Sequence, residues 1–338
     1  MKSLLKKSTF ALTLVLFMSS CAKKMEEIQM NEEKIIIGTA YPLNGLLTIP
    51  QVGDAPYPAV VLVHGSGASD MNEKVGNNRP FRDLAEGLAR HGIATIRYDK
   101  RPYAHGRELA KSGKLAEFTV KEEYIEDVVF AADLLRKDPR IDPERIFVLG
   151  HSLGGMLAPR IDAEGGNFAG LIIWAGSPRT LAEVLMEQQD EIAKTGNFFM
   201  RWLVNRQIKK TRELFHRMYD MTDEEAIATP LFGKHNTVYY WKEMGEKPAI
   251  NYLTDLLKPI IVMHPSDDFH VSIERDFEKY KEILANHPNA TFKLYPNLNH
   301  LFMPSIYGDI NKARKEYKKA QKVEEYVIND IADWIKNN

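Results

Sequence analysis

Short apolar runs alternate with amphipathic stretches through most of this 338-residue chain. Runs of this length that are rich in Val, Ile and Leu are typical of strands buried on both faces of a sheet. They occupy residues 57–65, 93–99, 145–150, 170–176, 259–264 and 291–296. Between them, apolar residues recur at helical spacing, for example over residues 79–92 and 119–135. This alternation predicts an α/β fold, with a mostly parallel sheet that is flanked by helices.

Two local signals refine this pattern near the start of the domain. Residues 33–50 contain two apolar segments and predict a hairpin, with Asn44-Gly45 as its turn or as a bulge. Further along, Thr119 and Glu122 have the spacing of a capping box and are expected to begin a helix.

The first twenty residues have the pattern of an export signal. Lysines precede an apolar run over residues 10–18, which is too short to span a bilayer. The run ends in MSSC at residues 18–21, which resembles the lipobox of bacterial lipoproteins. We therefore expect residues 1–20 to be a signal peptide and residues 21–33 to be a tether. Cys21 is expected to carry lipid and to hold the protein on a membrane; an ordinary signal peptide cut nearby is the alternative.

Composition excludes several function classes. The chain has 45 Lys and Arg residues against 46 Asp and Glu residues, a formal net charge of −1, and these charges are dispersed. A basic surface for nucleic acid is therefore not expected. The ten histidines lack the spacing of a metal-binding motif, and a Gly-rich phosphate loop is absent from the sequence. We expect neither a metal nor a cofactor.

One short motif carries candidate chemistry. Gly150-His151-Ser152-Leu153-Gly154 follows a predicted buried strand and precedes a predicted helix. A serine on a sharp turn between strand and helix can project its hydroxyl into a cleft, and glycines beside it allow close backbone approach. A serine hydroxyl is a weak nucleophile by itself and needs a base, which in turn needs an orienting acid.

Several segments together resemble the α/β-hydrolase superfamily. They are VVLVHGSGASD, RPFRDLAEGLARHGIATIRYDKR, GHSLGG, SDDFHV and YPNLNHLFMP, and the resemblance covers residues 33–338. It is strongest to bacterial carboxylesterases of the EstD type, which are related to the serine aminopeptidase and dienelactone hydrolase branches. The resemblance implies Ser152 as nucleophile, His300 as base and Asp268 as acid, in the superfamily's chain order. Asp267 is the rival for the acid.

The resemblance also implies an oxyanion hole made of two backbone N–H groups. In this superfamily they belong to the residue after the nucleophile and to a residue after the third strand, which here are Leu153 and Ser66. His64 and His151 are expected to support these motifs by packing or hydrogen bonding, and His270 to line the cleft.

The regular alternation stops between Trp174 and Pro259, where the residues are helical in period and rich in Met and aromatics. The resemblance implies a helical cap over about residues 178–250, inserted after the sixth superfamily strand. An aromatic cluster in this segment is expected either to line an acyl pocket or to pack the cap onto the body. Its members are Phe198, Phe199, Met200, Trp202 and Leu203.

These inferences favour a serine carboxylesterase that acts on small-molecule esters through an acyl-enzyme. A peptidase or a thioesterase would use the same residues. A noncatalytic binding lipoprotein is a third hypothesis, against which the full set of Ser152, Asp268 and His300 argues. The sequence leaves the acyl group, the alcohol and the oligomeric state open.

Overall fold

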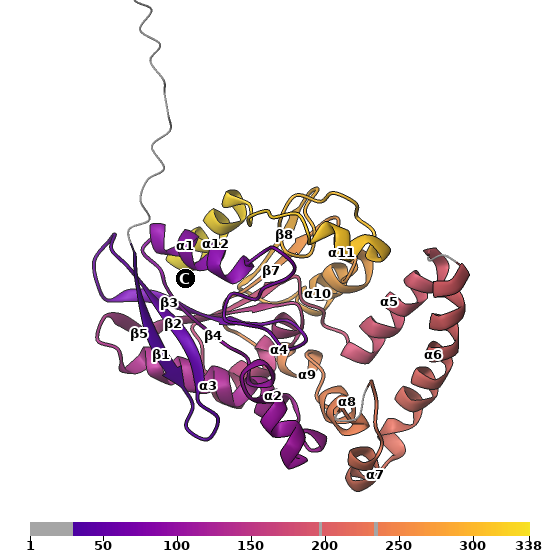
Figure 1. Cartoon of the computed structure of the whole chain (residues 1–338). Helices are drawn as coiled ribbons and strands as arrows, with labels where there is room; N and C mark the ends of the chain where they lie inside the picture. Colours follow the sequence, from indigo (N-terminus) through magenta and orange to yellow (C-terminus); the bar gives the residue numbers. More distant parts are fainter. Residues whose placement is uncertain (1–29, 196–197, 233–235) are drawn as a thin grey trace, which may run out of the picture.

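The predicted strands form one sheet of eight strands in the order β1-β2-β4-β3-β5-β6-β7-β8 (Figure 1). This computed structural model describes residues 30–195, 198–232 and 236–338, so Cys21 and the signal peptide lie outside the described residues. The strands are β1 Met30–Ile37, β2 Leu43–Pro50, β3 Tyr57–Val63, β4 Ala94–Tyr98, β5 Ile141–His151, β6 Leu171–Trp174, β7 Ile260–Pro265 and β8 Ala290–Tyr295. Strand β2 is antiparallel to β1 and β4, whereas the pairs from β4 to β8 are parallel.

The α-helices follow the predicted alternation. They are α1 Pro80–Arg90, α2 Arg101–Ser112, α3 Glu126–Lys137, α4 Leu153–Ile161, α5 Leu181–Thr195, α6 Phe198–Arg217, α7 Asp223–Ala228, α8 Val238–Glu246, α9 Ile250–Leu253, α10 Glu278–Ile283, α11 Ala313–Glu316 and α12 Glu325–Asn337. In the part of the chain that the structure describes, none of the helices combines the length and the apolar character needed to cross a membrane.

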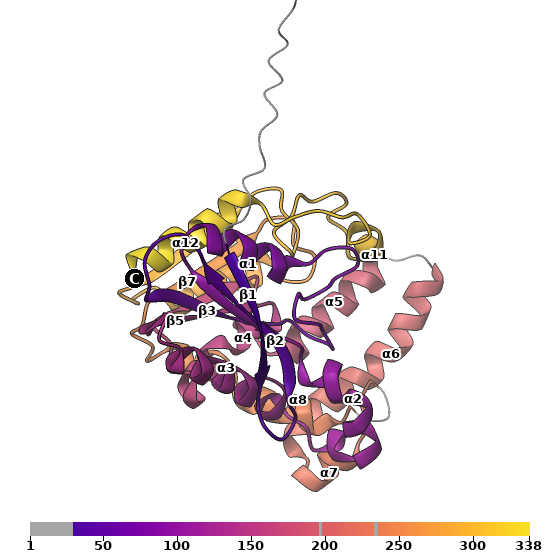
Figure 2. The same cartoon turned by 60° about the vertical axis from the view of Figure 1, so that its left-hand side comes forward.

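Helices cover both faces of the sheet, as the apolar strands predict (Figure 2). Val60 and Leu62 of β3 lie in one buried cluster with side chains of α1 and α12. Their neighbours Val61 and Val63 lie in a second cluster with side chains of α3 and α4. Because successive residues of a strand point to opposite faces, a single apolar strand serves both cores.

The N-terminal hairpin forms, but its turn is not where the sequence suggested. Asn44 and Gly45 lie inside β2, and the connection is formed by residues 38–42. A Cβ on Gly45 would lie 2.8 Å from the carbonyl oxygen of Arg97 in β4. Glycine at this position therefore reflects close approach of the neighbouring strand rather than a turn.

The predicted tether is too long at its C-terminal end. Residues Met30 to Glu33 belong to β1 and pair with β2, where Met30 faces Pro50. The charges that suggested a solvated linker are partnered, because Glu32 lies 2.5 Å from Arg97 and Glu33 lies 2.6 Å from Arg140. Residues 30–33, which were assigned to the tether, therefore belong to the sheet.

The capping interaction predicted at Thr119 is present. The backbone N–H of Thr119 donates to Glu122 at 2.9 Å, and its side-chain oxygen accepts from the N–H of Lys121 at 3.2 Å. The turn that follows, η2 Lys121–Ile125, is π-helical and continues directly into α3.

Helices α5 to α9 lie between β6 and β7, next to the sheet edge where the site residues gather (Figure 1). Phe198 is 87% exposed and Trp202 is 53% exposed. These two side chains are therefore not fully buried, and a role of the cluster in an acyl pocket or in packing stays a prediction. The side chains of Phe199, Met200 and Leu203 lie outside the described part of the chain.

Candidate active site

Ser152 lies on the turn between β5 and α4, in the strand-turn-helix context that the motif predicts. Its backbone has φ 53° and ψ −115°, a conformation that costs a non-glycine residue about 1–3 kcal/mol. A Cβ on Gly150 would lie 2.2 Å from the carbonyl oxygen of Gly154, and one on Gly154 would lie 2.4 Å from that of Val63. The two glycines thus make the sharp turn possible, and the turn presents Ser152 to a cavity of about 330 Å³.

His300 and Asp268 lie on the loops that follow β8 and β7. His300 Nδ1 lies 2.6 Å from Asp268 Oδ2, and both side chains are buried. The other oxygen of Asp268 accepts backbone N–H groups from His270 at 2.7 Å and Val271 at 3.1 Å. Asp267 instead accepts the hydroxyl of the adjacent Ser266 at 2.7 Å. The structure therefore brings Asp268, and not its rival, to His300.

The environment of His300 favours a neutral ring. Burial lowers the pKa of His300 well below its usual range, and the positive charge of His151 lowers it further. A neutral imidazole whose Nδ1 donates to Asp268 leaves Nε2 free of a proton and able to accept one. His300 and Ser152 line the same cavity, so the acceptor and the hydroxyl share one space.

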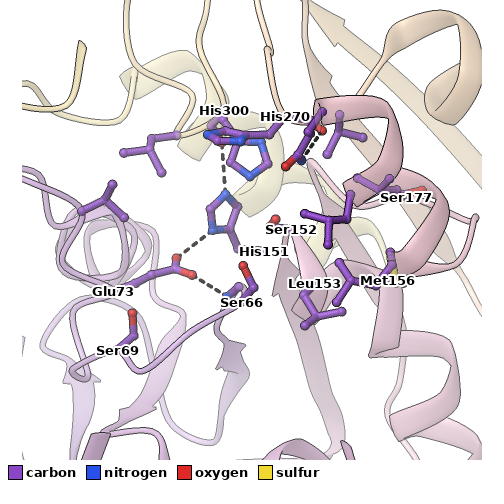
Figure 3. A pocket seen from close by; sticks show the side chains of 18 of the residues that line it. Ser66, Ser69, Glu73, His151, Ser152, Leu153, Met156, Ser177, His270 and His300 are labelled. Atoms are coloured by element: carbon purple, nitrogen blue, oxygen red, sulfur yellow. Dashed lines mark hydrogen bonds and ion pairs between the residues drawn. The ribbon is translucent and has the colours of Figure 1, made fainter. Parts of the chain in front are cut away.

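A buried ion pair between His151 and Glu73 lies next to His300 (Figure 3). His151 Nδ1 lies 2.9 Å from Glu73 Oε2, and His151 Nε2 lies 3.1 Å from the backbone oxygen of His300. Since both ring nitrogens face oxygen acceptors, His151 satisfies both contacts only when doubly protonated. Burial lowers the pKa of His151, but Glu73 outweighs this effect and the pKa is raised. The charged ring lies 4.7 Å from the His300 ring, measured between centroids.

The two residues predicted to donate backbone N–H groups to an oxyanion both line the cavity beside the serine. Leu153 is the first residue of α4, where an N–H group has no intrahelical acceptor. Ser66 follows β3 on a loop, and both residues line the same cavity as Ser152. An oxyanion hole requires donors aimed at the place where negative charge develops, and the assignment of this role to Ser66 and Leu153 stays a prediction.

The peptide that carries the Ser66 N–H is held on its opposite side. The carbonyl oxygen of Gly65 accepts from Lys100 Nζ at 3.0 Å and from the Tyr124 hydroxyl at 2.8 Å. Because C=O and N–H of a trans peptide point in opposite directions, fixing this carbonyl fixes the direction of the Ser66 N–H. The preceding N–H, that of Gly65, donates to Glu73 at 2.6 Å.

The other two histidines considered from the sequence lie next to the site. His64 is buried, and its Nε2 lies 3.0 Å from the carbonyl oxygen of Asp70. His270 lines the cavity, and burial followed by the charge of neighbouring groups lowers its pKa to about 3. Within the described ranges, His, Cys, Asp and Glu form no group of three that could hold a metal.

Glu73, Lys100 and Tyr124 were not identified from the sequence. Tyr124 fits the apolar periodicity of a helix, and Lys100 follows a strand beside other charged residues. Only the folded chain brings these side chains to one residue, Gly65, since they come from three separate segments. The sequence does show a run of charged residues directly after β4. Such a run is equally typical of a solvated loop, so it does not indicate a buried cluster.

Comparison with known proteins now assigns the family. The profile described as "Serine aminopeptidase, S33" matches residues 54–304, which is more than half of the chain. The chain belongs to this family. The S33 chain is 33% identical over 307 residues to esterase EstD of Thermotoga maritima, an alignment that covers 90% of this chain and 67% of EstD.

Solved structures place the S33 chain in the α/β-hydrolase fold. Est1E from Butyrivibrio proteoclasticus superposes with a TM-score of 0.53 at 18% identity, covering 88% of this chain and 99% of Est1E. A dienelactone hydrolase from Anabaena variabilis superposes with a TM-score of 0.52 at 16% identity, covering 91% of this chain and 98% of the other. At these identities the likeness concerns the fold, and it agrees with the sheet order described above.

Proposed function

We propose that this S33 chain is a serine carboxylesterase that hydrolyses small-molecule esters through an acyl-enzyme. The observation that carries the proposal is the 2.6 Å contact between Asp268 and His300. His300 lines one cavity with Ser152, which sits on a strained turn. The likeness to esterase EstD favours esters among the substrates that such a site can attack.

In the proposed mechanism, Ser152 Oγ forms a bond to the ester carbonyl carbon while His300 Nε2 takes the hydroxyl proton. The carbonyl oxygen becomes negative and accepts hydrogen bonds from the N–H groups of Ser66 and Leu153. The carbon–alkoxy bond then breaks, and His300 delivers its proton to the departing alcohol. Water repeats the cycle on the acyl-enzyme, with His300 again as base, and releases the acid. Asp268 stays ionised and keeps Nδ1–H directed toward itself.

A peptidase or thioesterase would use the same atoms, so the leaving group must be tested directly. We expect kcat/KM for an ester to exceed that for the amide and the thioester of the same acyl group. The panel should compare butyrate as ester, thioester and anilide, with aminoacyl anilides included because the family carries an aminopeptidase name. Faster cleavage of the aminoacyl anilides would replace the esterase assignment with a peptidase.

Two hydrogen bonds hold the Gly65 carbonyl, one from Lys100 Nζ and one from the Tyr124 hydroxyl, and we call this pair the clamp. It gives a separate prediction. Tyr124→Phe removes the hydroxyl that donates to this oxygen at 2.8 Å while keeping the ring. We expect kcat for a short ester to fall about tenfold with KM nearly unchanged, because misdirecting one oxyanion donor weakens only transition-state binding. Tyr280→Phe is the matched control, since Tyr280 is equally buried but lies on α10. A loss shared by both variants would contradict a role for the clamp.

We further propose that the enzyme is an exported lipoprotein held on a membrane through Cys21. The proposal rests on the MSSC sequence at the end of the apolar run, and Cys21 is the single cysteine of the chain. Cys21→Ser is expected to stop lipidation and to leave the precursor uncleaved or mislocalised. Detergent-phase partitioning and the mass of the mature N-terminus measure this. Recovery of the unaltered protein wholly in the soluble secreted fraction would contradict the anchor.

A further inference from the structure

A second cavity, of about 470 Å³, adjoins the one that contains Ser152. Four residues line both cavities and therefore lie between them: Ser66, Leu153, Leu181 and Trp241. We call it the oxyanion-side cavity, because it meets both predicted oxyanion donors. Among the described residues that line it, neither Ser152 nor His300 is present.

The geometry of the proposed reaction decides which part of an ester can enter this space. The carbon attacked by Ser152 carries an oxyanion near Ser66 and Leu153, a leaving oxygen, and the acyl chain. The leaving oxygen must lie next to His300, which gives it a proton. A cavity that touches the oxyanion donors but not His300 is therefore open to the acyl chain and closed to the alcohol.

The walls of the oxyanion-side cavity are apolar and come from distant parts of the chain. The apolar lining includes Pro102, Leu115, Phe118, Leu181, Phe232 and Trp241. Aromatic and aliphatic walls favour an apolar guest, by about 0.8 kcal/mol for each methylene group that leaves water.

The one carboxylate on this wall does not call for a cationic guest. Glu123 lies 2.7 Å from Lys100 Nζ, and the hydroxyl of the half-buried Tyr240 is hydrogen-bonded to Glu123 as well. The carboxylate is thus already paired within the protein. Its charge would still oppose an acyl chain that ends in a second carboxylate.

We propose that the oxyanion-side cavity is the acyl subsite, and that the preferred substrates are esters of uncharged medium-chain or aryl-substituted carboxylic acids. The alcohol occupies the cavity around His300, His270 and Tyr317, where the departing oxygen receives its proton. This inference rests on the proposed esterase function and specifies its substrate class.

The test narrows each cavity separately. Leu115→Trp fills the oxyanion-side cavity, whereas Val75→Trp fills the cavity of Ser152, which Val75 lines without reaching the other. Both positions are half-buried, so the two substitutions are matched in size and setting. Each variant is assayed with p-nitrophenyl acetate, octanoate and phenylpropanoate, and with acetates of methanol and octanol. Melting temperatures check folding, and Leu115→Ala serves as a second, cavity-enlarging variant.

Leu115→Trp is expected to lower the octanoate-to-acetate ratio of kcat/KM by about tenfold or more. The rate with p-nitrophenyl acetate serves as the denominator, so a general loss of activity does not count as a change of acyl preference. Val75→Trp is expected to change the relative kcat/KM values for the acetates of methanol and octanol instead. Leu115→Ala should shift the preference toward bulkier acyl groups, and a terminal carboxylate on the acyl chain should abolish the gain from chain length.

Two results would overturn the inference while leaving the esterase in place. The first is an octanoate-to-acetate ratio of kcat/KM that both Leu115 variants leave unchanged. The second is a ratio that falls in Val75→Trp but not in Leu115→Trp. Failure of the wild-type protein to hydrolyse even p-nitrophenyl acetate is a different outcome. It would reject the proposed function itself and the acyl subsite with it.

Discussion

Replacing Ser152 by Ala is expected to lower kcat for ester hydrolysis by about 10⁶-fold, close to complete loss. The substitution removes the only oxygen that the proposed mechanism uses to form the acyl-enzyme. KM and melting temperature should change little, because the φ of 53° at this position is retained and alanine keeps the same Cβ. Steady-state kinetics at high enzyme concentration measure the residual rate.

His300→Ala should cause a loss of similar size, and the double variant should be little worse than either single one. The nucleophile and its base act as one unit, so the second substitution has nothing left to remove. Losses that multiply in the double variant would show that the two side chains contribute independently. That result would contradict the mechanism even if each single loss were large.

Asp268→Asn is expected to lower kcat by about 10⁴-fold. An amide at this position presents a donor to His300 Nδ1, which favours the tautomer that carries its proton on Nε2 and cannot accept one from Ser152. The contact at stake is the 2.6 Å one between Asp268 Oδ2 and His300.

Asp267→Asn is the matched control, one residue away. Its carboxylate accepts the Ser266 hydroxyl, so kcat should stay within about twofold of the wild-type value. Near-complete loss in Asp267→Asn together with an active Asp268→Asn would overturn the assignment of the acid. Equal losses in both variants would indicate that the loop after β7 had been disrupted.

The order of strands and helices was predictable because buried strands and amphipathic helices leave distinct periodicities. The strand before Ser152 and the helix after it follow directly from this, and so does the turn between them. Parallel strands also bring their carboxyl ends to one edge, which explains why loops after β7 and β8 meet at His300. Hydrogen-bond partners across that edge depend on register, which the sequence does not display.

Other features escaped prediction for identifiable reasons. Gly45 looked like a turn residue, but the contact that requires glycine is with Arg97, which is distant in sequence. Lys100 and Glu73 had no predicted role, yet the Lys100 side chain is 1% exposed and that of Glu73 is 4% exposed. Burial of a charge depends on the partner that folding supplies, and a local pattern does not reveal that partner.

Covalent capture by a fluorophosphonate probe tests the central claim most directly, because the probe reports an activated serine without any assumption about substrate. Intact-mass analysis and peptide mapping of the folded wild-type protein should find a single adduct on Ser152. The Ser152→Ala variant should remain unmodified, and His300→Ala should react far more slowly, since its serine lacks a base. Folded wild-type protein that stays unmodified, or that carries its adduct on another serine such as Ser66, would contradict the account.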